Sequence, residues 1–151
     1  MNGQFDGKTN LKEVIETEGR FVGTSVGVSM LPMIRSGKDV IVVEKKEGRL
    51  KEYDVALYTR GDSYVLHRVL KVIDGAYVIR GDNCYSDEYI PEENVFGVLT
   101  EFFRGDKKVD LKSKKYLRYV KRRIKTYPIR KFLMRVKSAV RRFAKRIIKG
   151  K

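Results

Sequence analysis

Two residues of this chain have the side chains of a hydrolytic nucleophile and of its base. Ser29 follows the small apolar run Val26-Gly27-Val28 and precedes Met30-Leu31-Pro32. His67 is the only histidine and lies in an otherwise apolar run. A serine hydroxyl becomes nucleophilic when a base lies within hydrogen-bonding reach, and an imidazole suits proton transfer at neutral pH. The two residues therefore permit acyl transfer by a serine–histidine pair.

Purely structural explanations exist for both residues. Pro32 would end a strand soon after Ser29, as proline commonly does where a strand passes into a turn. His67 would share a strand face with Val65 and Val69, where a lone histidine can simply be part of the core. Cys84, the only cysteine, is an alternative nucleophile, but it lies in a polar turn without a supporting motif.

An acid that orients the imidazole would complete a catalytic triad. Asp82, in the turn Arg80-Gly81-Asp82-Asn83, is the first choice, and Asp87 or Glu88 are the alternatives. The competing interpretation of this segment is a polar turn capped by its own side chains. With one cysteine and one histidine, the chain offers no Cys/His zinc site, and no cofactor is expected.

The hydrophobic pattern predicts a mainly β body between two helical segments. Asn10-Leu11-Lys12-Glu13 has the form of a capping box, and Gly19 would end the short helix that it opens. Short apolar runs separated by glycine turns then indicate an antiparallel sandwich or a partly open barrel. The predicted strands are 40–43, 54–58, 64–72, 76–79 and 95–103.

Charge divides the chain into an acidic body and a very basic end. The whole chain has a net charge of +15, yet residues 107–151 contain 20 Lys and Arg against one acid, Asp110. Apolar residues recur there at helical spacing, from Tyr116 to Tyr127 and, after a break at Pro128, from Ile129 to Ile148. We expect two amphipathic basic helices. Their apolar stripe could enter an anionic membrane surface, accompany nucleic-acid binding, or pack on the body or a partner helix.

Three ordered segments resemble the motifs of one family. Ser29-Met30-Leu31-Pro32, followed by Gly37-Lys38-Asp39-Val40-Ile41-Val42, resembles the nucleophile box of type I signal peptidases. Tyr53-Asp54-Val55-Ala56 with Leu66-His67-Arg68-Val69 resembles the segment that carries the base, and Gly81-Asp82-Asn83 the downstream box. The similarity covers about Phe21 to Phe103. Within the signal peptidase and LexA-like clan, a histidine in the position of the base resembles the endoplasmic-reticulum and archaeal-type branch.

The resemblance implies a serine endopeptidase with an antiparallel β catalytic domain. Ser29 would attack the scissile carbonyl, His67 would take its proton, and an acid of the downstream box would assist. Substrates would be peptides or precursor proteins with small residues near the cut. They would bind along Val26, Gly27, Val28, Met30 and Pro32. Two departures stand out: Lys38 lengthens the usual glycine-aspartate pair, and Gly27 replaces a hydroxyl residue that is a second oxyanion donor in some relatives.

These patterns predict three segments: an N-terminal helical segment (1–20), a protease domain (21–106) and a basic helical tail (107–151). The first twenty residues lack an apolar core, and no stretch is long enough to span a bilayer. We therefore expect a cytoplasmic protein held peripherally at an anionic membrane surface by its tail, with nucleic acid as the alternative partner of that tail. The alternative functions are a LexA-like self-cleaving regulator and a non-catalytic binding module.

Overall fold

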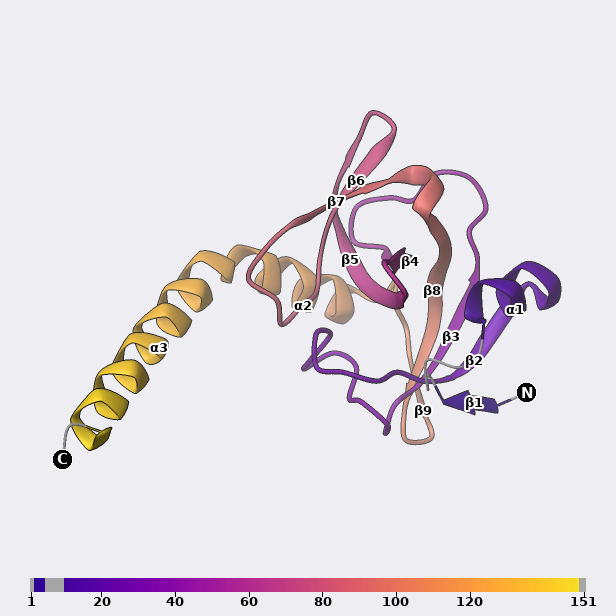
Figure 1. The fold of residues 1–151 in the computed structure, drawn as a ribbon. Helices are drawn as coiled ribbons and strands as arrows, with labels where there is room; N and C mark the ends of the chain where they lie inside the picture. The colour runs from indigo at the N-terminus through magenta and orange to yellow at the C-terminus, as the bar shows by residue number, and fades with distance from the viewer. Residues whose placement is uncertain (1, 5–9, 150–151) are drawn as a thin grey trace.

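The computed structural model describes residues 2–4 and 10–149, with side chains described from residue 10 to residue 143. It confirms a mainly β protein: a curled, mostly antiparallel sheet with three α-helices (Figure 1). The strands are β1 (Asn2–Gln4), β2 (Arg20–Thr24), β3 (Val40–Lys45), β4 (Val55–Arg60), β5 (Ser63–Ile73), β6 (Ala76–Arg80), β7 (Glu88–Pro91), β8 (Val95–Arg104) and β9 (Lys107–Val109). The helices are α1 (Leu11–Glu18), α2 (Lys114–Lys125) and α3 (Tyr127–Lys149), with a short 3₁₀ turn at Glu92–Asn94.

The strands follow the order β1-β2-β3-β8-β4-β5-β6-β7, and β9 pairs with β8. Only the β1–β2 pair is parallel among the pairs described. The hairpin β4–β5 places Ala56 opposite His67 and Tyr58 opposite Val65. Because side chains alternate across a strand, Tyr58 and His67 lie on the same face, one diagonal step apart.

Local sequence signals account for the elements that were predicted. The Asn10 side chain accepts a hydrogen bond from the Glu13 backbone N–H, and Gly19 ends α1 in the left-handed conformation, with φ of 76°. The five predicted strands are present as β3, β4, β5, β6 and β8. Pro128 lies in the first turn of α3, where its missing N–H costs no helical hydrogen bond. The strands β1, β2, β7 and β9 were not predicted.

All three predicted segments contribute to one hydrophobic core. Leu11 and Ile15 of α1 pack in the same buried cluster as Tyr116 and Val120 of α2. Residues 107–109 are part of the sheet, so the chain after residue 106 is not a detached tail. The α2 helix instead belongs to the body, whereas α3 projects away from it (Figure 1). Residues 1, 5–9 and 150–151, and the side chains of Ile147 and Ile148, lie outside the described part.

No helix in the described ranges combines the length and the apolar character that crossing a membrane requires.

Candidate active site

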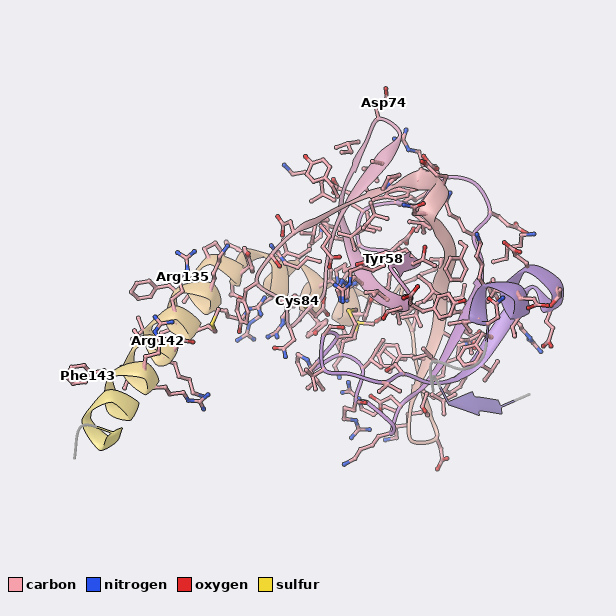
Figure 2. The ribbon with its side chains drawn as sticks, viewed as in Figure 1. Tyr58, Asp74, Cys84, Arg135, Arg142 and Phe143 are labelled. Atoms are coloured by element: carbon pink, nitrogen blue, oxygen red, sulfur yellow. The ribbon has the colours of Figure 1, made fainter. Side chains whose placement is uncertain are left out.

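The predicted nucleophile and base line one cleft of about 380 Å³. Four parts of the chain form it: the connection from β2 to β3, which carries Ser29; the end of β4, at Arg60; strand β5, which carries His67; and the loop after β6, which carries Cys84. Figure 2 marks Cys84 on that loop and Tyr58 inside the curled sheet. Ser29 and His67 are 38 positions apart in the sequence, and the fold brings them to the same cavity.

The loop after β6 holds the Ser29 segment in place. The Asn83 backbone N–H donates to the Ser29 carbonyl oxygen at 2.7 Å, and the Asn83 side chain donates to the Val28 carbonyl oxygen at 3.1 Å. The Ser29 hydroxyl and its backbone N–H make no hydrogen bond to any residue that the structure describes. The main chain around Ser29 is therefore held in place, while the Ser29 hydroxyl and backbone N–H remain available to a substrate.

The segment is also fixed from its far end. Buried Asp39 accepts hydrogen bonds from the Arg35 backbone N–H at 2.9 Å and from the Arg35 guanidinium at 2.9 and 2.6 Å. Gly37 adopts φ of 65° in this turn, and its N–H donates to the Ser25 carbonyl oxygen at 3.0 Å. The additional residue Lys38 is accommodated in this exposed turn.

The His67 ring is buried, with only 2% of the residue exposed, and it has partners on both nitrogens. Nδ1 lies 3.1 Å from the Tyr58 hydroxyl and 3.2 Å from Glu88 Oε1. Nε2 lies 4.0 Å from Cys84 Sγ. A carboxylate at Nδ1 favours the tautomer that carries its proton on Nδ1 and leaves Nε2 free to accept one.

Burial lowers the pKa of His67 below its ordinary value, because the apolar surroundings disfavour the imidazolium. The negative charge of Glu88 opposes this shift, and the nearby positive charge of Arg60 adds to it. At neutral pH the ring is therefore uncharged, which is the protonation state that a general base requires.

The structure separates the three candidate acids. Glu88, at the start of β7, is the one in contact with His67. Asp82, the first choice from the sequence, instead makes a bidentate ion pair with Arg68 (Nε–Oδ1 2.7 Å, Nη2–Oδ2 2.9 Å) and also accepts from the Tyr119 hydroxyl. Asp87 accepts from Arg80 at 2.8 Å. Asp82 and Asp87 have no direct contact with the imidazole.

Because Gly81 has no side chain, the Ser29 backbone, the His67 ring and the Cys84 sulfur can all approach it closely. A methyl group added there would lie 2.7 Å from the Ser29 carbonyl oxygen, 2.8 Å from Cys84 Sγ and 2.9 Å from His67 Nε2. Such distances are shorter than van der Waals contact, so no larger side chain fits without displacing one of the three. The Ser29 carbonyl oxygen and His67 Nε2 therefore lie 2.7 and 2.9 Å from the same point, the position of a methyl group added at Gly81.

Four of the five predicted substrate-binding residues line the cleft: Val26, Gly27, Val28 and Met30. Pro32 does not; it lines a separate cavity with residues of β8, β9 and α2. Val26 and Val28 are each 62% exposed, so their side chains are accessible to a peptide in the cleft. The Gly27 N–H donates to the Ser36 hydroxyl, the Gly37 N–H donates to the carbonyl oxygen of the preceding Ser25, and no described residue bonds the backbone of Val26.

Reasoning from the sequence missed three side chains of the site: Tyr58 at Nδ1 of His67, Arg60 beside Glu88, and Asn83 under Ser29. A detectable signal existed for Tyr58. The two-residue turn Gly61-Asp62 sets the register of the β4–β5 hairpin, and this register places Tyr58 on the His67 face.

Comparison with known proteins adds no family assignment: no protein-family model matches the chain, and no curated protein matches it either.

Proposed function

We propose that this protein is a serine endopeptidase of the signal-peptidase type. The observation that carries the proposal is the meeting of Ser29 and a neutral, carboxylate-bound His67 at one cleft. The ordered motifs around both residues agree with this assignment. Glu88 replaces Asp82 as the proposed acid of the triad, since it alone of the three candidates contacts the imidazole.

In the proposed reaction, Ser29 Oγ attacks the scissile carbonyl carbon and His67 Nε2 takes the hydroxyl proton. The Ser29 N–H, which has no hydrogen-bond partner among the described residues, donates to the developing oxyanion. His67 then passes its proton to the leaving amine, and water hydrolyses the acyl-enzyme in the second half of the reaction. Glu88 stabilises the transient imidazolium through Nδ1.

The substrate would bind as an added strand along Val26–Val28. The Gly27 N–H is already bonded to Ser36, and the Val28 carbonyl oxygen accepts from Leu31 and Asn83. The backbone groups of Val26 and the Val28 N–H have no partner among the described residues, and both residues line the cleft. An extended peptide can pair with such groups through main-chain hydrogen bonds. Small side chains near the cut follow from the resemblance of the Ser29 and His67 segments to signal peptidases.

Cys84 is the competing nucleophile, because its sulfur lies 4.0 Å from His67 Nε2. Burial raises the pKa of the Cys84 thiol, and the nearby charge of Glu88 raises it further. The raised pKa removes the usual advantage of a thiol as a nucleophile, and the ordered motifs include Ser29 rather than Cys84, so we assign the attack to Ser29.

The test is cleavage of a panel of exported precursor proteins by the intact protein, with new termini mapped by mass spectrometry. We expect cuts after small residues, present with the wild type and with Cys84→Ala, and absent with Ser29→Ala and His67→Ala. Cleavage that persists in both of the latter variants would refute the assignment, and loss of cleavage in Cys84→Ala alone would transfer it to the cysteine.

A second prediction concerns Gly81. We expect Gly81→Ala to abolish most cleavage, because its methyl group displaces either the Ser29 backbone or the His67 ring. It should also cost about 1–3 kcal/mol of stability, as overpacking usually does. Gly105→Ala is the matched control: that glycine has φ of 62° but open space around it, so stability falls by about 1 kcal/mol while cleavage persists. Thermal unfolding and peptide cleavage, measured together, check both. Equal activity of the two variants would contradict the proposed geometry.

A further inference from the structure

Helix α3 exposes a continuous apolar stripe. Six of its large apolar side chains are between 45% and 67% exposed: Ile129, Phe132, Leu133, Val136, Val140 and Phe143. Their spacing of three, four or seven residues places them on one side of the helix. Figure 2 shows Phe143 pointing away from the β body. Exposed apolar area of this size on a helix that contacts little else indicates a surface that something covers.

Cations border this stripe on both sides. On a helical wheel, Arg130, Lys137 and Arg141 follow one border of the stripe, and Lys131, Arg135 and Arg142 lie toward the other. The whole of α3 contains nine Lys and Arg and no acid. An apolar face between two rows of cations is typical of helices that lie in the headgroup region of an anionic membrane.

The cationic border nearer to the body forms a groove. Arg130, Lys137, Ser138 and Arg141 line a cavity of about 430 Å³ together with Tyr85, Leu133 and Met134. Arg130 is held against the body, because its Nη1 and Nη2 atoms donate to the carbonyl oxygens of Asp82 at 3.2 Å and Arg123 at 2.8 Å. Lys137 and Arg141 have no ion-pair partner among the described residues and line the groove beside Leu133 and Met134, an arrangement that suits a phosphate attached to acyl chains.

We infer that α3 binds the surface of anionic phospholipid membranes, with its apolar stripe at the acyl boundary and Lys137 and Arg141 on lipid phosphates. Nucleic acid would satisfy the cations but leave six apolar side chains in water. A second copy of the chain would cover the stripe but bring two sets of cations together, which is unfavourable. An anionic membrane satisfies both features at once.

The inference is independent of the proposed peptidase activity, but together the two would locate that activity at a membrane surface. Tyr85, which borders the groove, follows directly after Cys84, which lines the catalytic cleft. The cleft would therefore face substrates at the membrane surface. Because the Ser29→Ala variant keeps α3 intact, it should bind vesicles as the wild type does, which separates failure of this inference from failure of the proposed chemistry.

The test is flotation of the full chain with vesicles of phosphatidylcholine alone and of phosphatidylcholine mixed with phosphatidylglycerol. We expect binding to the mixed vesicles only, weakened at high salt. The double variant Phe132→Ser with Phe143→Ser should lower the affinity at least about tenfold, because each exposed ring contributes apolar burial. Tyr89→Ser is the matched control, since Tyr89 is 72% exposed on β7, far from α3 in sequence, and should leave binding unchanged.

Three outcomes would overturn the inference. The first is no binding to the mixed vesicles, and the second is full binding by the double phenylalanine variant. The third is another occupant of the stripe. Self-association that the double variant abolishes, seen by analytical ultracentrifugation, would assign the stripe to a second copy. Duplex DNA bound more tightly than the mixed vesicles, and equally by the double variant, would assign the cations to nucleic acid.

Discussion

Replacing Glu88 by glutamine is expected to lower kcat for peptide cleavage by about 10⁴-fold, the loss seen when a triad carboxylate becomes an amide. The amide can no longer favour the Nδ1-protonated tautomer, nor stabilise the imidazolium that forms when Ser29 is deprotonated. Because Glu88 raises the pKa of His67 while burial and Arg60 lower it, the substitution should also lower that pKa further. The acid limb of the kcat/KM profile should therefore move to lower pH.

Asp87→Asn is the matched control for this prediction. Asp87 is the neighbouring carboxylate, is 47% exposed at its side chain, and pairs with Arg80 rather than with His67. We expect its activity and pH profile to stay close to those of the wild type. A merely structural role for Glu88 would reduce activity without moving the acid limb. An unchanged limb in Glu88→Gln would therefore contradict a direct effect on His67.

The second large effect is on stability. Asp82→Asn is expected to lower the free energy of unfolding by about 3–5 kcal/mol, because it leaves the Arg68 charge buried without its counterion. The two side chains are only 1% and 2% exposed. Burial alone would lower the pKa of Arg68, but the hydrogen bonds and charge of Asp82 raise it above its ordinary value, so the guanidinium stays charged. Thermal unfolding followed by circular dichroism should show a Tm lower by about 10 °C.

Glu101→Gln provides the comparison for this effect. Glu101 pairs with Lys108 across β8 and β9, where both side chains are substantially exposed. Such pairs contribute about 0–1 kcal/mol, so the Tm should change little. Equal Tm values for Asp82→Asn and Glu101→Gln would show that Arg68 finds compensation elsewhere, for instance from the Tyr53 carbonyl oxygen and the Tyr116 hydroxyl that it already contacts.

Where the fold follows local chemistry, it was predictable. The capping box at Asn10, the stop at Gly19 and the break at Pro128 each act within a few residues, and the structure has them where the sequence indicates. The strands β1, β7 and β9 are three or four residues long. Such segments depend on pairing with strands distant in the sequence, so their own composition gives little signal.

Identifying the acid of the site required the register of the sheet. Arg68 lies opposite Arg80 across β5 and β6, so two cations share a face and each needs a carboxylate. Asp82 forms an ion pair with Arg68, and Asp87 forms one with Arg80. Glu88 pairs with Ile79, which pairs with Val69 on the face of His67. Alternation along the strands therefore assigns Glu88 to the imidazole, but only after these partners are known.

The connections of α2 also decide where this chain can be shortened. Tyr116 and Val120 fill the core, Tyr119 reaches the Asp82 carboxylate, and Arg123 donates to the carbonyl oxygens of Asp82 and Leu31. A cut at Asp110, where the basic segment begins in the sequence, would open the core and release the loop that supports Ser29. A shortened protein that keeps its fold has to end after Arg130, which still donates to the Asp82 carbonyl oxygen. The charge pattern and the folding unit therefore have different boundaries, and the removable part is the outer portion of α3 alone.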